Sequence, residues 1–319
     1  RMRNAKILVA GANGLSNELC KNIVLAGVGA VTLVDAGKVE GKDLGSQFFL
    51  REEDVGKSRA EASAHRIHEL NPRVDVKALA KDIRVEEDEF FRTFDIVCVS
   101  GCDRDAIIRI NTICQKHGIK FWAAGVAGFL GYLFCDLGDE YKFVREFKTK
   151  DATTTTECSL SFSRFADALE AKWGAATLDR RRTKALRMEV HPVFFSFRLL
   201  WEFWSKQGRL PLPNNAEDVD LLVSFKEASL TSAEMDPSYL PDDSVRHLAQ
   251  TATAELSPVC AVLGGFLAQE VLKVLSGKGE PFRNFFCYDG NSAVGKVFQI
   301  PLVASKGKEK EEETVSIED

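Results

Sequence analysis

The chain has 319 residues, of which 45% are apolar and 28% are charged. This composition is ordinary for a soluble globular protein and excludes wholesale disorder, collagen-like repeats and a membrane channel. The formal net charge is −5, and the segment 306–319, with three lysines against six acidic residues, supplies −3 of it. The rest of the chain is therefore near −2 and lacks the basic surplus of a nucleic-acid-binding protein. Because no uninterrupted run of about 18 apolar residues occurs, we expect no membrane-spanning helix.

Eight cysteines raise the question of a metal site or a disulfide framework. Most stand in apolar surroundings, no two form a C-x-x-C pair, and the five histidines do not cluster with them. We therefore expect no metal site, and we expect reduced, buried thiols in a nuclear protein that is also present in the cytoplasm. The cysteines are Cys20, Cys98, Cys102, Cys114, Cys135, Cys158, Cys260 and Cys287.

The first part of the chain alternates between strand and helix signals. Short apolar runs predict buried strands, and helical spacing of apolar residues with Asn-Pro or Gly at the ends predicts the helices between them. Such alternation is typical of a parallel sheet covered by helices on both faces, a Rossmann-like α/β fold. The predicted strands are 6–11, 30–35, 74–79, 94–100 and 119–125, the predicted helices are 15–26, 58–70 and 103–117, and 131–138 is predicted to add a hairpin edge.

The middle of the chain has a different pattern. The polar, threonine-rich stretch 148–157 is predicted to be a loop or linker. The stretch 194–204 is apolar around most of a helix, so it is either core or a partner surface. The helices predicted in this part are 162–173, 178–189, 192–207 and 219–229.

The C-terminal part again shows the helix and strand signals of the first part. A long apolar helix begins at Ser257-Pro258 and ends at Gly277, and two strands are predicted at 285–290 and 295–300. We therefore predict one α/β domain, formed by 1–145 and 250–303, that a helical insertion at 146–249 interrupts. The charged tail 304–319 is predicted to be disordered.

A glycine-containing loop follows the first predicted strand, where a nucleotide-binding α/β fold places its phosphate loop. The loop is G-A-N-G-L-S-N-E at 11–18, and Asp35 ends the second strand, where a carboxylate can accept hydrogen bonds from ribose. Against G-x-G-x-x-G, however, only Gly11 fits, because Asn13 and Ser16 occupy the other two glycine positions. This disfavours a NAD-dependent oxidoreductase and leaves open a purely structural strand–helix turn.

The run 6–35 resembles the adenylation-domain family that activates ubiquitin-like proteins, with bacterial relatives in molybdopterin and thiamine biosynthesis. Active members carry G-x-G-G-x-G-C/S-E at the loop. The runs P-V-C-A-V-L-G-G-F-L-A-Q-E-V-L-K at 258–273 and N-F-F-C-Y-D-G at 284–290 are similar to eukaryotic members. The resemblance covers 1–145 and 250–300 well and the insertion loosely, and it is nearest to the non-catalytic halves of heterodimeric SUMO-activating enzymes.

Departures from the active pattern predict a poor ATP site. Joining a carboxylate to the α-phosphate of ATP brings anions together, so the site needs cations and magnesium. The resemblance puts Gly45-Ser46-Gln47 where active members have Asn-Arg-Gln, and Arg59 where they keep a lysine. Asp103 aligns roughly with their magnesium ligand, but we favour it as the N-cap of the helix that follows. The residues predicted to remain from the pocket are Gly11, Gly14, Asp35, Arg59 and Asp103.

The family's second chemistry is thioester formation on a cysteine in the insertion. Cys158 is the candidate, because it stands in a polar segment. The active pattern, a Cys-Thr after Pro or Gly, is absent, since Glu157 precedes the cysteine and Ser159 follows it. An acidic neighbour disfavours the thiolate that a nucleophile needs. We therefore predict no catalytic residue in this chain.

The resemblance implies the non-catalytic subunit of a heterodimer that activates SUMO by ATP-dependent adenylation and thioester transfer. ATP and magnesium would be bound by the catalytic partner subunit, and SUMO would be met through the complex, with neither nucleic acid nor membrane as a partner. In the family, an N-terminal arginine of this half reaches the partner's nucleotide; we expect that segment upstream of residue 1, and Arg1 and Arg3 on a surface turn. The alternatives are the regulatory half for another ubiquitin-like modifier and a self-competent adenylating enzyme.

Overall fold

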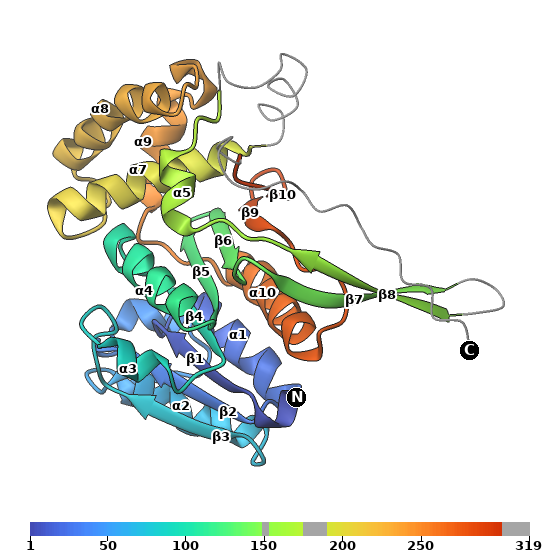
Figure 1. Cartoon of the computed structure of the whole chain (residues 1–319). Helices are drawn as coiled ribbons and strands as arrows, with labels where there is room; N and C mark the ends of the chain where they lie inside the picture. The colour runs from blue at the N-terminus through green and yellow to red at the C-terminus, as the bar shows by residue number, and fades with distance from the viewer. Residues whose placement is uncertain (149–152, 175–189, 302–319) are drawn as a thin grey trace.

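The core of the molecule is an eight-stranded sheet, seen in the computed structural model of the chain, which describes residues 1–148, 153–174 and 190–301 (Figure 1). The strand order is β10-β9-β6-β5-β4-β1-β2-β3, and β3 to β5 form a parallel 3-2-1-4-5 arrangement. This confirms the predicted mostly parallel α/β fold. The strands are β1 (Lys6–Ala10), β2 (Ala30–Val34), β3 (Asp75–Leu79), β4 (Ile96–Ser100), β5 (Lys120–Ala127), β6 (Leu130–Asp136), β9 (Asn284–Asp289) and β10 (Val294–Phe298).

The prediction of a hairpin edge at 131–138 is only half right. β6 does form an antiparallel hairpin with β5, but it lies inside the sheet, because β9 pairs with its other side. Leu133, Phe134 and Cys135 of β6 are fully buried, so both faces and both edges of the strand need cover. The strand that supplies this cover comes from the far end of the chain, which local sequence does not reveal.

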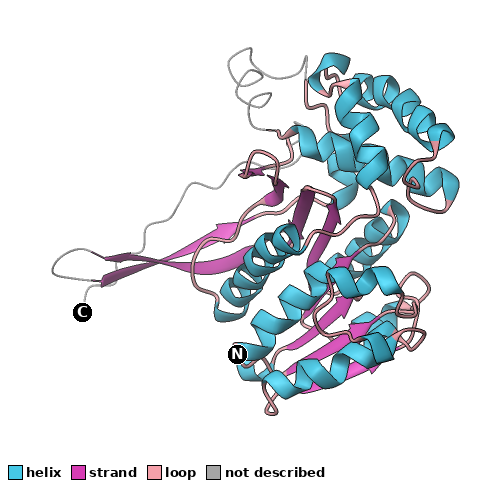
Figure 2. Ribbon diagram, turned by 180° about the vertical axis from the view of Figure 1, so that it is seen from behind, coloured by secondary structure: helices cyan, strands magenta, loops and turns pink. Residues whose placement is uncertain are grey.

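Alternate side chains of the strands divide the core into two layers. Ile7 and Val9 of β1 face one layer, and Leu8 and Ala10 face the other. Helices cover both faces, as Figures 1 and 2 show. The first layer packs under α1 (Gly14–Leu25), α2 (Arg59–Leu70) and α10 (Ser257–Ser276), and the second packs under α3 (Asp88–Phe91), α4 (Arg104–Lys116), α5 (Phe165–Glu170), α7 (Pro192–Gln207), α8 (Ala216–Ser232) and α9 (Asp242–Thr251).

The threonine-rich stretch predicted as a loop is largely a strand. β7 (Tyr141–Lys148) and β8 (Thr153–Leu160) form an antiparallel hairpin that projects from the body of the molecule (Figure 1). Threonine is β-branched and favours strands despite its polarity. The base of the hairpin is held by Tyr141, Phe143 and Phe162, which are buried in the first layer.

The helices after this hairpin follow the prediction in part. α7 has the predicted bounds, α5 is shorter than the predicted helix 162–173, and α8 begins earlier, because the Asn215 side chain caps it by accepting from Glu217 N and Asp218 N. α9 was not predicted. The predicted helix 178–189 and the predicted disordered tail 304–319 lie outside the described residues.

The aromatic helix α7 belongs to the core. Phe194, Phe203 and Trp201 are at most 3% exposed, and α7 packs on β6, β9 and α4. Of the two interpretations that the sequence leaves open for 194–204, the structure supports core packing. The insertion thus shares one hydrophobic layer with the sheet, which fixes its helices against the α/β domain.

α10 is also a packed helix. By length and composition it is the one helix of the described residues that could cross a membrane, and half of it is buried within the molecule. It lies against α1 and β6. Gly264 makes this contact possible, because a Cβ there would lie 2.4 Å from Glu18 Cβ and 2.8 Å from Leu15 O. Gly265 faces open space.

A buried carboxylate joins the insertion to the sheet. Asp136, 2% exposed at the end of β6, accepts from Asn111 Nδ2 at 2.7 Å, and Asn111 Oδ1 accepts from Phe165 N at 2.9 Å. Burial raises the pKa of Asp136 above its ordinary value of 3.8 and outweighs the opposing hydrogen bonds from Asn111 and Gly138.

The raised pKa predicts a pH effect on stability. Above pH 3.8 the unfolded chain loses the Asp136 proton before the folded chain does, so the contribution of this group to stability is full at lower pH and is lost as pH rises through the folded pKa. In urea titrations from pH 3.5 to 7, the free energy of unfolding of the wild type relative to Asp136→Asn should fall with rising pH. A constant difference would contradict the prediction.

Candidate functional site

The predicted nucleotide loop lies at the point where the strand order reverses, between the carboxyl ends of β1 and β4. Ligands of open α/β sheets bind at this position. Gly11 has φ +90°, and a Cβ on it would lie 2.0 Å from Ser100 O. Only glycine therefore fits where the end of β1 meets the end of β4. The first glycine of the loop is explained by this close approach, without a ligand.

Three backbone amides of the loop that a phosphate would need are occupied by the chain's own side chains. Ala12 N donates to Asp35 Oδ2 at 2.8 Å, Gly14 N to Glu255 Oε2 at 2.9 Å, and Ser16 N to Asn13 Oδ1 at 2.9 Å. Asn13 is the N-cap of α1. Gly14 N and Ser16 N, at the anion-binding end of α1, are thus satisfied internally.

The Asp35 carboxylate, which was expected to accept hydrogen bonds from a ribose, is also bonded within the chain. Asp35 Oδ1 accepts from Gly37 N at 2.6 Å and from Arg59 Nη2 at 3.1 Å. Arg59 Nη1 also lies 3.5 Å from Asp43 Oδ2. Burial acts to lower the pKa of Arg59, but the carboxylates of Asp35 and Asp43 hold it above its ordinary value. The guanidinium is committed to two carboxylates, which disfavours a phosphate contact.

Ser46 and Asp103, the two other positions compared with the active pattern, take structural roles. Ser46, which stands where active relatives have arginine, is 8% exposed and donates from Oγ to Glu255 Oε2 at 2.8 Å. Asp103 caps α4, since its Oδ1 accepts from Ala106 N at 2.9 Å, which confirms the favoured N-cap interpretation. Among the described residues, no group of three or more His, Cys, Asp or Glu is arranged to hold a metal ion.

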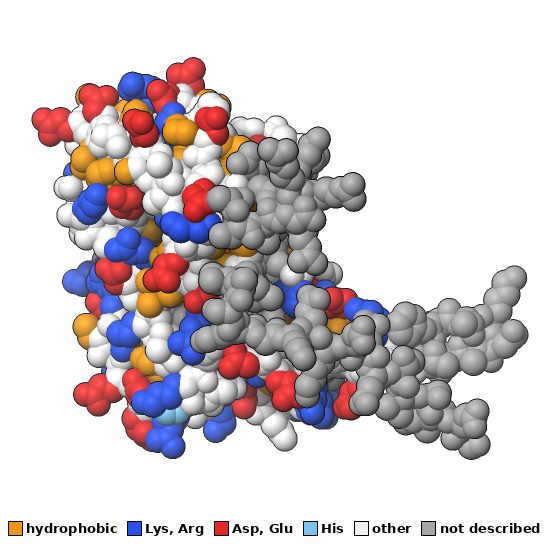
Figure 3. Space-filling view, turned by 45° about the horizontal axis from the view of Figure 1, so that its top comes forward, with side chains coloured by type: hydrophobic (Ala, Val, Ile, Leu, Met, Phe, Trp, Pro, Cys, Tyr) orange, Lys and Arg blue, Asp and Glu red, His pale blue; other side chains and the backbone are white. Residues whose placement is uncertain are grey.

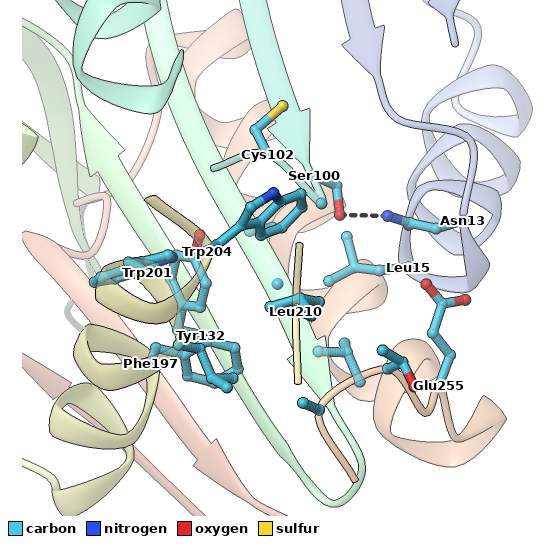
Figure 4. A pocket seen from close by; sticks show the side chains of 17 residues that line it. Asn13, Leu15, Ser100, Cys102, Tyr132, Phe197, Trp201, Trp204, Leu210 and Glu255 are labelled. Carbon is cyan, nitrogen blue, oxygen red and sulfur yellow. Dashed lines mark hydrogen bonds between the residues drawn. The ribbon is translucent and has the colours of Figure 1, made fainter. Parts of the chain in front are cut away.

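Two small cavities meet at the end of β4. One of about 210 Å³ is lined by Gly11, Asp35 and Arg59, and the other of about 120 Å³ lies under α7. In the second cavity, aromatic side chains lie on one side, and Asn13 and Glu255 lie on the other (Figure 4). Its aromatic side chains are Tyr132, Phe197, Trp201 and Trp204. Trp204 lines both cavities, so α7 covers the crevice where a substrate would enter.

The thiols of the site region are poor nucleophiles. Burial, aided by Asp103, raises the pKa of Cys102 to about 12, although Arg84 opposes the shift. Cys158 lies on β8, half-buried among residues of the first core layer, with its Sγ 3.9 Å from Thr156 O. It pairs with Phe143 at the base of the β7–β8 hairpin and lines neither of the two cavities beside the glycine loop.

Comparison with known proteins identifies the family. The model of the ThiF family matches residues 1–309. The chain belongs to the ThiF family. It is 37% identical over 319 residues to SUMO-activating enzyme subunit 1 of Homo sapiens, with 93% of this chain and 89% of that protein covered. The subunit 1 proteins of Mus musculus, at 37% with 93% and 88% covered, and Danio rerio, at 34% with 93% and 89% covered, are similarly related. The family resemblance read from the glycine loop and from 258–290 is confirmed.

Sequence reasoning missed Glu255 in this ThiF domain. It stands in the short segment between α9 and α10, 241 residues from Gly14, and nothing in its local sequence marks it. Arg1 and Arg3 are exposed at a 3-10 turn, Met2–Asn4, before β1, as expected. The described surface shown in Figure 3 intersperses acidic and basic side chains, without the single-sign field of a nucleic-acid site.

Proposed function

We propose that this chain is the non-catalytic subunit of a heterodimeric SUMO-activating enzyme. One observation carries the proposal: this chain is similar to SUMO-activating enzyme subunit 1, and three of its glycine-loop amides, which ATP phosphates would need, are bonded to its own side chains. ATP and magnesium are then bound by the partner subunit, which also carries the thioester cysteine. This subunit supplies scaffold and interface, and the complex works chiefly in the nucleus.

The outer face of α10 supports a protein partner. Val262 is 42% exposed, and Gly265 has open space beside it. With Phe266, Leu272 and other residues they form an apolar groove of about 510 Å³, which we name the α10 groove; it is lined by Asn22, Val262, Gly265, Phe266, Ala268, Gln269, Leu272 and Phe286. The same helix buries its other face on α1, so the groove is the face left for the second half of a pseudo-symmetric dimer.

Assembly tests the proposal directly. On co-expression, the chain should copurify with the catalytic subunit of a SUMO-activating enzyme, and the mixture should form SUMO adenylate from SUMO, ATP and magnesium. Co-expression with the catalytic subunits for other ubiquitin-like modifiers is the matched comparison. Preferential pairing with one of those would favour the alternative, the regulatory half for another modifier, and would overturn the assignment to SUMO.

Nucleotide binding tests the division of labour. Calorimetric titration of magnesium ATP should show no binding at micromolar concentrations to the isolated chain and one site in the heterodimer. The expected difference follows from the occupied amides and from the serine at position 46, which leaves the pocket without a free cation at that place. Micromolar, magnesium-dependent binding to the isolated chain would favour a self-competent adenylating enzyme.

A further inference from the structure

Glu255 connects three parts of the chain that are distant in sequence. One carboxylate oxygen, Oε2, accepts from Gly14 N at 2.9 Å and from Ser46 Oγ at 2.8 Å. Gly14 opens α1, Ser46 follows the 3-10 turn Gly41–Gly45, and Glu255 lies in the segment that returns from the insertion. The Glu255 side chain thus links the segment between α9 and α10 to the glycine loop.

The returning segment, residues 252–257, is fixed on both sides of this carboxylate. Gly128 N donates to Ala254 O at 2.8 Å, where the turn between β5 and β6 meets the segment. Ser257 Oγ donates to Gly45 O at 3.1 Å. α9 ends at Thr251 and α10 begins at Ser257, so the segment joins the last helix of the insertion to the first element that rejoins the domain.

The absence of a side chain at Gly14 leaves room for the Glu255 carboxylate at the start of α1. A Cβ on Gly14 would lie 3.2 Å from Glu255 Oε2, 3.0 Å from Ser46 Cβ and 2.9 Å from Cys260 Sγ, so a side chain here would crowd the contact. A negative charge is favoured at a helix N-terminus, where free N–H groups and the helix dipole point toward it. The negative charge at this helix end belongs to the protein itself.

We propose that the glycine loop of this chain serves as an intramolecular anchor: the Glu255 carboxylate, bound at the N-terminus of α1 and by Ser46, holds the returning segment and so fixes the C-terminal end of α9 beside the loop. The loop has the placement of a phosphate-binding loop but holds an internal anion. All the groups involved belong to this chain, so the anchor can be tested whether or not the chain pairs with a SUMO-type partner.

The anchor predicts coupled loosening of segments far apart in sequence. In amide hydrogen exchange on the full chain, Glu255→Ala should speed exchange about tenfold in 12–16, 45–48 and 245–257 together, the size expected for loss of a helix-capping carboxylate. Glu255→Gln retains an acceptor oxygen but loses the charge, so it should show a smaller effect in the same segments. Glu227→Ala, an exposed glutamate on α8, is the control and should leave all three segments unchanged.

A double-mutant cycle tests whether Ser46 and Glu255 act as one unit. Ser46→Ala removes one of the two donors, so the double variant Ser46→Ala/Glu255→Ala should be little less stable in urea than Glu255→Ala alone. Additive effects, or faster exchange confined to 252–257 in Glu255→Ala, would overturn the anchor. If Glu255→Ala does not fold, hydrogen exchange of Glu255→Gln is the test. Faster exchange in 12–16, 45–48 and 245–257 together supports the anchor, and faster exchange confined to 252–257 overturns it.

Discussion

Replacing Gly264 with alanine should destabilise the chain, whereas the same change at the neighbouring Gly265 should stabilise it slightly. An added Cβ at 264 would lie 2.8 Å from Leu15 O and 3.2 Å from Leu19 N. These are backbone atoms of α1, so they cannot move away unless the whole helix shifts. Overpacking of this kind costs about 1–3 kcal/mol. Alanine gains about 1 kcal/mol over glycine in a helix, and at 265 nothing opposes that gain.

The pair is decisive because both glycines are interior residues of α10 and share its helix propensity. The free energy of unfolding of each variant is measured in urea. The difference between the two values gives the cost of the added Cβ against α1. Val at 264 should enlarge the loss further, because its branched side chain needs more of the space that α1 fills. Equal stability of Gly264→Ala and Gly265→Ala would contradict the helix contact.

Placing a charge in the α10 groove should weaken assembly strongly without unfolding the chain. Val262 is 42% exposed in the isolated chain, so Val262→Asp leaves its carboxylate in water there. In a heterodimer formed through the groove, the same carboxylate would be buried without a partner, which is strongly unfavourable. We expect affinity for the catalytic subunit to fall at least about thirtyfold, the effect of losing a hot-spot residue of about 2 kcal/mol.

Val85→Asp is the matched control. Val85 is 75% exposed on the segment between β3 and α3, away from α10, and the change is chemically the same. Thermal unfolding checks that both variants are folded, and size-exclusion chromatography with the catalytic subunit measures assembly. If Val262→Asp assembles as well as Val85→Asp, the α10 groove is not the heterodimer interface.

The family and the parallel half of the sheet could be predicted from the sequence for a local reason. β1, β2, β4 and β5 are short, mostly apolar runs, because a strand buried on both faces leaves little room for polar residues, whereas the edge strand β3 (Asp75–Leu79) is partly exposed and carries Asp75 and Lys77. A glycine follows β1 (Gly11), β4 (Gly101) and β5 (Gly128) directly and marks where each strand ends. The motif runs at 11–18 and 258–290 then identified the family, which the match over 1–309 confirms.

Local signals were weakest where pairing or burial is decided at long range. The stretch 148–157 was predicted as a polar loop, yet β8 (Thr153–Leu160) pairs residue by residue with β7. The 131–138 strand looks like an edge, yet a strand about 150 residues later in the chain covers it. In both cases the partner, rather than the strand's own composition, determines the structure.

The α/β architecture, the family and the absence of glycine at 13 and 16 can be read from residue types, because each depends on a residue type at a fixed local spacing. The groups that occupy the loop in place of a ligand emerge from the folded chain alone. Arg59 turns to Asp35 and Asp43, and Glu255 reaches the start of α1 from 241 residues away. Hydrogen bonds between such distant residues exist only once the sheet and α10 have packed, so no local pattern contains them.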